Sequence, residues 1–172
     1  MILRPFIMFI IITMNLVLQS TLFQYIELLN IRPNTSLLLI ISYAILRGDI
    51  EGSIFGFVSG LMQDIFFGRV IGLYALFGLI TGFVCGHPFK NFFRENVIIS
   101  LVLSIVVTFL YEFVFYVTNF LIMGHLNVEY YMRSVIIPGV VYTTSLSVFV
   151  YMFLYAINAK IEAFEKARRK MF

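Results

Sequence analysis

The sequence predicts an all-α integral membrane protein in which six transmembrane helices form one bundle. The chain is 61% hydrophobic and only 12% charged, whereas soluble domains are about 45–50% apolar and about 25% charged. Its charges also stand in short clusters between long uncharged runs. These two observations indicate a single polytopic membrane domain, residues 1–172, without a soluble domain on either face.

The apolar runs divide into six spans. Because a helix rises 1.5 Å per residue, about 20 residues cross a hydrocarbon core of ~30 Å. The second and third spans are at or below this length, so we expect protein neighbours rather than lipid to surround them. The last two exceed it and can tilt or project. In order, the spans are Pro5–Leu28, Pro33–Leu46, Ile50–Phe67, Val70–Phe89, Asn96–Met123 and Ser134–Ala159.

The first span resembles a signal peptide in position, but its end, LVLQSTLFQ, offers no small-x-small cleavage site. We therefore expect it to be retained, with the N-terminus in the cytoplasm. This orientation puts nine Lys and Arg residues on the inner side and three on the outer side, and so predicts that both termini are cytoplasmic. The inner set is Arg4, Arg47, Lys90, Arg94, Lys160, Lys166, Arg168, Arg169 and Lys170; the outer set is Arg32, Arg69 and Arg133.

The third and fourth spans carry glycines at intervals of four. In a helix this spacing makes a stripe of small residues, into which a second helix can pack closely. Two alternatives stay open: packing against spans of the same chain, or against the helix of a partner. The glycines concerned are Gly48, Gly52, Gly56, Gly60, Gly68 and Gly72, followed by Gly78, Gly82 and Gly86.

Polar residues inside spans are costly in a membrane and therefore informative. In the predicted orientation Gln19, Asp64 and Glu112 lie in the outer half, with Arg69 and Arg133 at the outer surface. We expect the two carboxylates to face the bundle interior and to pair with these arginines or with amides of the spans. The alternative is that they simply reach the outer head groups.

The fifth span places several of its polar residues on one broad face. The sixth is followed by a basic tail, residues 160–172, which is predicted to anchor the inner side near anionic lipid or to serve as a docking motif. The net charge of +3 is explained by this asymmetry, so it does not indicate nucleic acid as a partner. The polar face comprises Ser104, Thr108, Tyr111, Glu112, Thr118 and Asn119.

No catalytic constellation is present in the sequence. His87 and His125 fall on opposite sides of the membrane in this topology and cannot share a metal. The one cysteine, Cys85, is expected to be a small buried hydrophobe. We therefore expect no enzyme activity, no metal and no cofactor.

The second to fourth spans carry a set of motifs between roughly residues 33 and 86. The set comprises Pro33, Tyr43 and Arg47-Gly48, then Gly56-x-x-x-Gly60-Leu61-x-x-Asp64 and Gly68, and finally Ile71-Gly72-Leu73-Tyr74-x-Leu76. It resembles the MreD family of rod shape-determining bacterial membrane proteins.

This resemblance implies a non-enzymatic scaffold of the cell-wall elongation machinery in the bacterial inner membrane. Such a scaffold binds MreC, a protein with a single membrane span. Through MreC it connects to the RodA–penicillin-binding-protein peptidoglycan synthase and, indirectly, to MreB. The family fold is also similar to the S-components of energy-coupling-factor transporters.

A competing interpretation follows from that last likeness, namely a substrate-binding subunit of a small-molecule or vitamin transporter. Gln19, Asp64 and Glu112 would then line a pocket open to the outside. S-components, however, typically carry an Ala-x-x-x-Ala-like surface on the first span, where this chain reads FIMFIIITMNLVLQ. An intramembrane enzyme is the least favoured interpretation.

Overall fold

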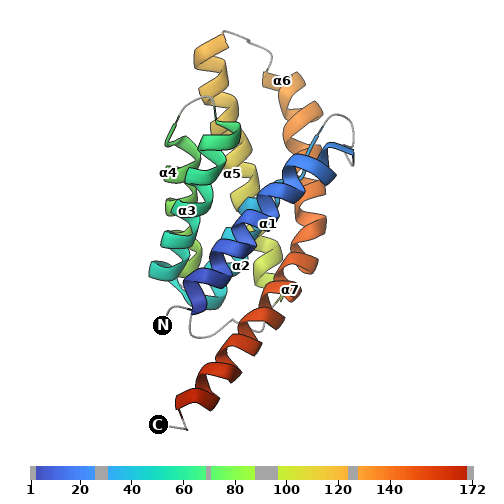
Figure 1. Cartoon of the computed structure of the whole chain (residues 1–172). Coiled ribbons are helices and arrows are strands. Elements are labelled where there is room, and N and C mark those ends of the chain that lie inside the picture. The colour runs from blue at the N-terminus through green and yellow to red at the C-terminus, as the bar shows by residue number, and fades with distance from the viewer. Residues whose placement is uncertain (1–2, 26–30, 69–70, 88–96, 124–127, 170–172) are drawn as a thin grey trace.

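The computed structural model describes residues 3–25, 31–68, 71–87, 97–123 and 128–169 (Figure 1). All elements of this part of the chain are helices. The first five are α1 (Leu3–Tyr25), α2 (Thr35–Arg47), α3 (Asp49–Phe67), α4 (Leu73–Gly86) and α5 (Val97–Met123). The last is continuous and consists of α6 (Val128–Tyr131), the π-helical segment η1 (Met132–Ile136) and α7 (Ile137–Arg169).

The predicted all-α membrane class is confirmed. Three helices of the described chain are long and apolar enough to cross a membrane, over Arg4–Thr21, Val97–Thr118 and Glu129–Ala167. Two further apolar helices, α2 and α4, are shorter than a full span. Large apolar side chains cover the outside of the bundle, as shown by Phe6 at 62% exposed and Phe149 at 73%. Such a surface suits lipid rather than water.

Helix α2 is the centre of the bundle. Every residue from Thr35 to Leu46 is buried, and α2 contacts α1, α3, α4, α5 and α7. Its 13 residues span only about 20 Å at 1.5 Å per residue. The prediction of a short span held by protein neighbours therefore agrees with this arrangement. The helix begins at Thr35 rather than at Pro33, because the Asn34 side chain accepts a hydrogen bond from Leu37 N at 3.1 Å and caps it.

The last helix differs most from its predicted bounds. It begins at Val128 instead of Ser134 and runs on to Arg169, so that its final turns project past the other helices (Figure 1). Near its beginning, Ile137 N donates to Met132 O, an i→i−5 bond. Pro138 follows at once, and since proline lacks an N–H the regular ladder is interrupted there. The π-helical segment accommodates this interruption without breaking the helix.

Helix α4 is shorter than expected at its start. It begins at Leu73, whereas the apolar run predicted Val70, because Gly72 has φ +100° and a left-handed conformation that ends the preceding turn. The predicted end of this span, Phe89, lies outside the described residues, as does the predicted end of the first span, Leu28.

Candidate functional site

The glycines of α3 and α4 face one another. A Cβ atom on Gly56 would lie within 3.0 Å of the backbone of Gly78, and one on Gly52 would meet the backbone of Gly82 equally closely. Gly60 stands in the same way against Tyr74. The two backbones are therefore in direct contact, and this pair forms the most extensive helix–helix contact of the described chain. The predicted small-residue faces pack within the chain, α3 against α4.

Three glycines predicted for these faces lie at helix ends instead. Gly48 separates α2 from α3 with φ +94°, and Gly72 precedes α4 with φ +100°, conformations that L side chains rarely adopt. Gly68 ends α3, where its N–H donates to Gln63 O and Asp64 O at 3.1 Å. Spacing by four could not distinguish these turn positions from helix-packing positions, because the same residue type serves both.

Asp64 connects the end of α3 to the start of α4. Its side chain is buried, at 2% exposed. Oδ1 accepts a hydrogen bond from Tyr74 N and Oδ2 accepts one from Ala75 N, both at 3.0 Å. The first amides of a helix have no partner within the helix, and Gly72 has no side chain to cap them. The carboxylate thus acts as an N-cap supplied by the neighbouring helix, stabilised further by the helix dipole.

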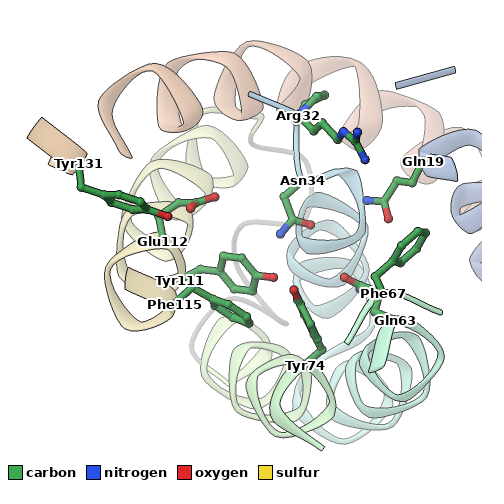
Figure 2. A pocket seen from close by; sticks show the side chains of 11 residues that line it. Gln19, Arg32, Asn34, Gln63, Phe67, Tyr74, Tyr111, Glu112, Phe115 and Tyr131 are labelled. Atoms are coloured by element: carbon green, nitrogen blue, oxygen red, sulfur yellow. The ribbon is translucent and has the colours of Figure 1, made fainter. Parts of the chain in front are cut away.

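A polar cavity of about 340 Å³ opens near the beginning of α2. Figure 2 shows Glu112, Asn34 and the hydroxyl groups of Tyr74 and Tyr111 directed toward its centre. The lining residues come from α1, α3, α4, α5 and α6 and from the segment before α2; they are Gln19, Arg32, Pro33, Asn34, Gln63, Phe67, Tyr74, Tyr111, Glu112, Phe115 and Tyr131.

The structure brings together only some of the polar residues predicted for the outer half. Gln19 and Glu112 line the cavity, whereas Asp64 does not. Arg133 was expected to be buried beside a carboxylate but has a 76% exposed side chain and pairs with Glu129 at 3.1 Å, one helical turn away. Arg133 lies within the π-helical segment, on the exposed surface of its helix, which explains this difference. Arg69 lies outside the described residues.

One wall of the cavity is fixed by a network of hydrogen bonds between α1 and α2. Asn15 Nδ2 donates to Ser36 Oγ at 2.6 Å, and Thr35 Oγ1 donates to Asn15 Oδ1 at 2.7 Å. Gln19 Nε2, one turn further along α1, donates to Thr35 Oγ1 at 3.1 Å. Asn15 and Gln19 are one turn apart on α1 and so share a face, and their partners Thr35 and Ser36 are the first residues of α2.

The family-motif residues Tyr43 and Arg47 lie at the opposite end of the bundle. Arg47 Nε donates to Glu51 Oε2 at 2.8 Å, and Nη1 reaches Glu162 Oε1 at 3.3 Å. The hydroxyl of Tyr43 donates to Glu51 Oε2 at 3.1 Å. This charged cluster joins α2, α3 and α7. Arg4 of α1 extends it through its ion pair with Glu165.

The acidic partners in this cluster were not predicted from the sequence. Glu51 stands only four residues after Arg47, but Gly48 puts the two on different helices, so their contact is made across the turn between α2 and α3. Glu162 and Glu165 gave no comparable signal, since they lie far from Arg4 and Arg47 in the sequence. Their pairing depends on α7 returning to the start of α1, which spacing along the chain does not encode.

The remaining reactive side chains make no catalytic group in the described part of the chain. Cys85 is fully buried. His87 ends α4 and stands 3.3 Å from Asp49 at the start of α3, and His125 lies outside the described residues. Over the described residues, no three His, Cys, Asp or Glu side chains come close enough together to hold a metal ion.

Fold and sites together define a polytopic α-helical membrane protein with a glycine-packed helix pair, a polar cavity at one end and a charged cluster at the other. The family model of the rod shape-determining protein MreD matches residues 1–161. The chain belongs to the MreD family, a family of membrane proteins that determine rod shape and are not known enzymes. No curated protein and no solved structure matched the chain.

Proposed function

We propose that this protein is a non-enzymatic scaffold of the cell-wall elongation complex in the bacterial inner membrane. In this role it holds the span of an MreC-like protein and so links that protein to the RodA–penicillin-binding-protein synthase and, indirectly, to MreB. Membership of the MreD family over residues 1–161 is the observation that carries the proposal. The described chain consists mainly of apolar membrane helices. This supports the proposal, because such a protein binds a partner mainly through contacts within the bilayer.

The orientation is part of the proposal. With both termini cytoplasmic, the charged cluster of Arg4 and Arg47 faces the cytoplasm and the polar cavity faces outward. The beginning of α1 and the end of α7 lie toward the same end of the bundle (Figure 1), which is compatible with this orientation. The excess of Lys and Arg on that side, including the basic tail of residues 160–172, supports it further.

The surface to test first for the partner helix is an apolar groove between α5 and α7. The small-residue faces of α3 and α4 are filled by one another, so they offer no open seat in this arrangement. The α5–α7 groove is hollow and has a volume of about 380 Å³. Its lining residues are Ile105, Val106, Phe109, Leu110, Ile137, Val140 and Val141.

Co-expression with an MreC-like single-span protein tests the proposal. We expect the two proteins to co-purify from detergent-solubilised membranes. Val106→Phe, which fills the groove, should reduce the yield of partner at least tenfold. Val84→Phe is the matched control, because Val84 is a similarly exposed apolar residue on α4. Failure of the wild-type pair to co-purify would contradict the scaffold role, and equal loss in both variants would contradict the groove.

A second candidate, a substrate-binding membrane subunit of a transporter, is favoured by one observation, the polar cavity lined by Gln19 and Glu112. The two functions differ in their phenotype. Depletion of a scaffold should turn rod-shaped cells round, whereas depletion of a transport subunit should create a nutrient requirement while shape is kept.

A further inference from the structure

The cavity at the start of α2 contains a carboxylate inside the membrane domain. Glu112 lies on α5 at a position that is only partly accessible, and its side chain extends into the cavity (Figure 2). Among the described residues it forms no hydrogen bond and no ion pair. Charged groups within membrane helices are expensive and usually have a partner or line a polar path. A ligand with the opposite charge would supply that partner.

Aromatic rings stand around this carboxylate. The ring centroids of Tyr111 and Phe115 are 4.4 Å apart, and those of Tyr74 and Phe115 are 4.8 Å apart, so these three rings form one continuous wall. Tyr131 of α6 lies beside Glu112 from the other side (Figure 2). A carboxylate flanked by aromatic faces is the combination that proteins use to bind ammonium groups, through charge and cation–π attraction together.

The opposite rim of the cavity has a different character. Arg32 and Asn34 lie there, on the segment that enters α2, and Gln19 reaches the cavity from α1 (Figure 2). Guanidinium and amide groups donate hydrogen bonds and suit phosphate or carboxylate oxygens. At about 340 Å³, the cavity has the size of a small-molecule site.

We propose that this cavity binds a zwitterionic amine, with its ammonium group against Glu112 and the aromatic rings and its anionic group toward Arg32. This chemistry has two sources: a water-soluble amine, or the head group of a lipid such as phosphatidylethanolamine. The proposal does not depend on the scaffold function. Its test measures ligand binding by the isolated protein, whereas the scaffold is tested by co-purification.

The chain provides its own reporter for the test. Cys85 is the one cysteine in the sequence and is fully buried, so a thiol-reactive fluorescent maleimide labels it only as the protein unfolds. The midpoint of thermal unfolding can then be measured on the full chain in lipid nanodiscs. A ligand that binds the folded state raises this midpoint. Each variant serves as its own reference, because only the ligand-induced shift is compared.

Two matched pairs of probes distinguish the sources. The soluble pair is phosphoethanolamine and glycerol 3-phosphate, which share the phosphate and differ in the ammonium group, both added to phosphatidylglycerol nanodiscs. The lipid pair is phosphatidylethanolamine nanodiscs and phosphatidylglycerol nanodiscs. We expect the ammonium-bearing member of at least one pair to raise the midpoint by about 3 °C relative to its partner.

The variants connect that shift to the cavity. Glu112→Gln should abolish it, whereas Glu129→Gln, at an exposed glutamate that pairs with Arg133, should retain it. If Glu112→Gln does not fold, Tyr131→Leu replaces it, since that change removes an aromatic face of the same cavity. A shift confined to the soluble pair identifies a free amine, and a shift confined to the lipid pair identifies a head group. The absence of any shift, or its persistence in both cavity variants, would overturn the proposal.

Discussion

The carboxylate of Asp64 accepts a hydrogen bond from the backbone N–H of Ala75 at 3.0 Å, across the interface between α3 and α4. A residue near the end of one helix thereby caps the beginning of the next. The family-motif residues Asp64 and Gly72 are explained together, because Gly72 permits the turn but supplies no cap. Asp64 is thus a structural residue that sets how α3 and α4 meet.

Replacement of Asp64 should destabilise the α3–α4 pair. Asp64→Leu removes both hydrogen bonds and leaves two buried N–H groups without partners, so we expect a loss of about 2–3 kcal/mol. Asp64→Asn keeps one acceptor and should lose less. Labelling of Cys85 during thermal unfolding measures both variants. Glu129→Gln is the exposed control, and an unchanged midpoint in Asp64→Leu would show that the cap does not contribute.

The glycine contact between α3 and α4 should be intolerant of a single methyl group. Gly56→Ala and Gly78→Ala each place a Cβ within 3.0 Å of the facing backbone, and we expect each to reduce stability by about 1–3 kcal/mol. The matched control is Gly139→Ala in α7, where the nearest atom would be Ile31 Cγ2 at an ordinary 3.6 Å.

Helix propensity alone predicts that these Gly→Ala variants are more stable than the wild type, since alanine favours a helix by about 1 kcal/mol over glycine. The Gly139 variant should therefore be as stable as the wild type or slightly more stable. If all three variants behaved alike in the unfolding assay, close backbone packing would not be the reason for the glycines.

The charged cluster should couple α2 to α7 energetically. A double-mutant cycle on Arg47 and Glu162 measures their interaction separately from other effects of each change. Because the Arg47 side chain is only 10% exposed, we expect a coupling of about 1–2 kcal/mol. The comparison pair, Arg133 and Glu129, is 76% and 82% exposed and should show about 0.5 kcal/mol or less. Equal couplings would mean that the cluster is only a surface feature.

The hydrogen bonds between α1 and α2 should stabilise the fold, although they lie near the cavity rim. Asn15→Leu removes one hydrogen-bond partner from each of Thr35 and Ser36, and we expect a loss of about 1–2 kcal/mol. Thr13→Val is the control, because the Thr13 hydroxyl bonds only within its own helix, to Phe9 O at 2.8 Å. Similar midpoints for the two variants would contradict this role.

The fold class and the family could be predicted from the sequence because both depend on local signals. Long apolar runs identified the helices, and the motif from Pro33 to Leu76 identified the family. Asp64 was singled out from the sequence as a residue of interest, but its capping of α4 was not predicted. Capping depends on where α4 begins, and apolar runs locate helix ends poorly when a turn such as Ile71-Gly72 is itself apolar.

Sequence reasoning missed the local pair of Arg133 and the contacts that are set by distant segments. Arg133 was expected to pair with Asp64 or Glu112, yet it pairs with Glu129, one turn away on an exposed surface. Helix α7 extends past the bundle and brings Glu162 to Arg47. This arrangement is determined by tertiary contacts alone. Pro138 was a usable signal, because a proline inside an apolar helix predicts an irregular turn, and the π-helical segment occurs directly before it.

The burial of α2 has a consequence for how the chain is made. A 13-residue helix is too short to remain stably in lipid by itself, and its Thr35 and Ser36 side chains form hydrogen bonds with Asn15 and Gln19 of α1. During synthesis we therefore expect α2 to remain at or near the insertion machinery until the later helices are made and surround it. Helix α7 is the last of these helices and contacts α2 through the pair of Glu162 with Arg47. In a chain that stops before α7, we therefore expect α2 to stay accessible to membrane proteases.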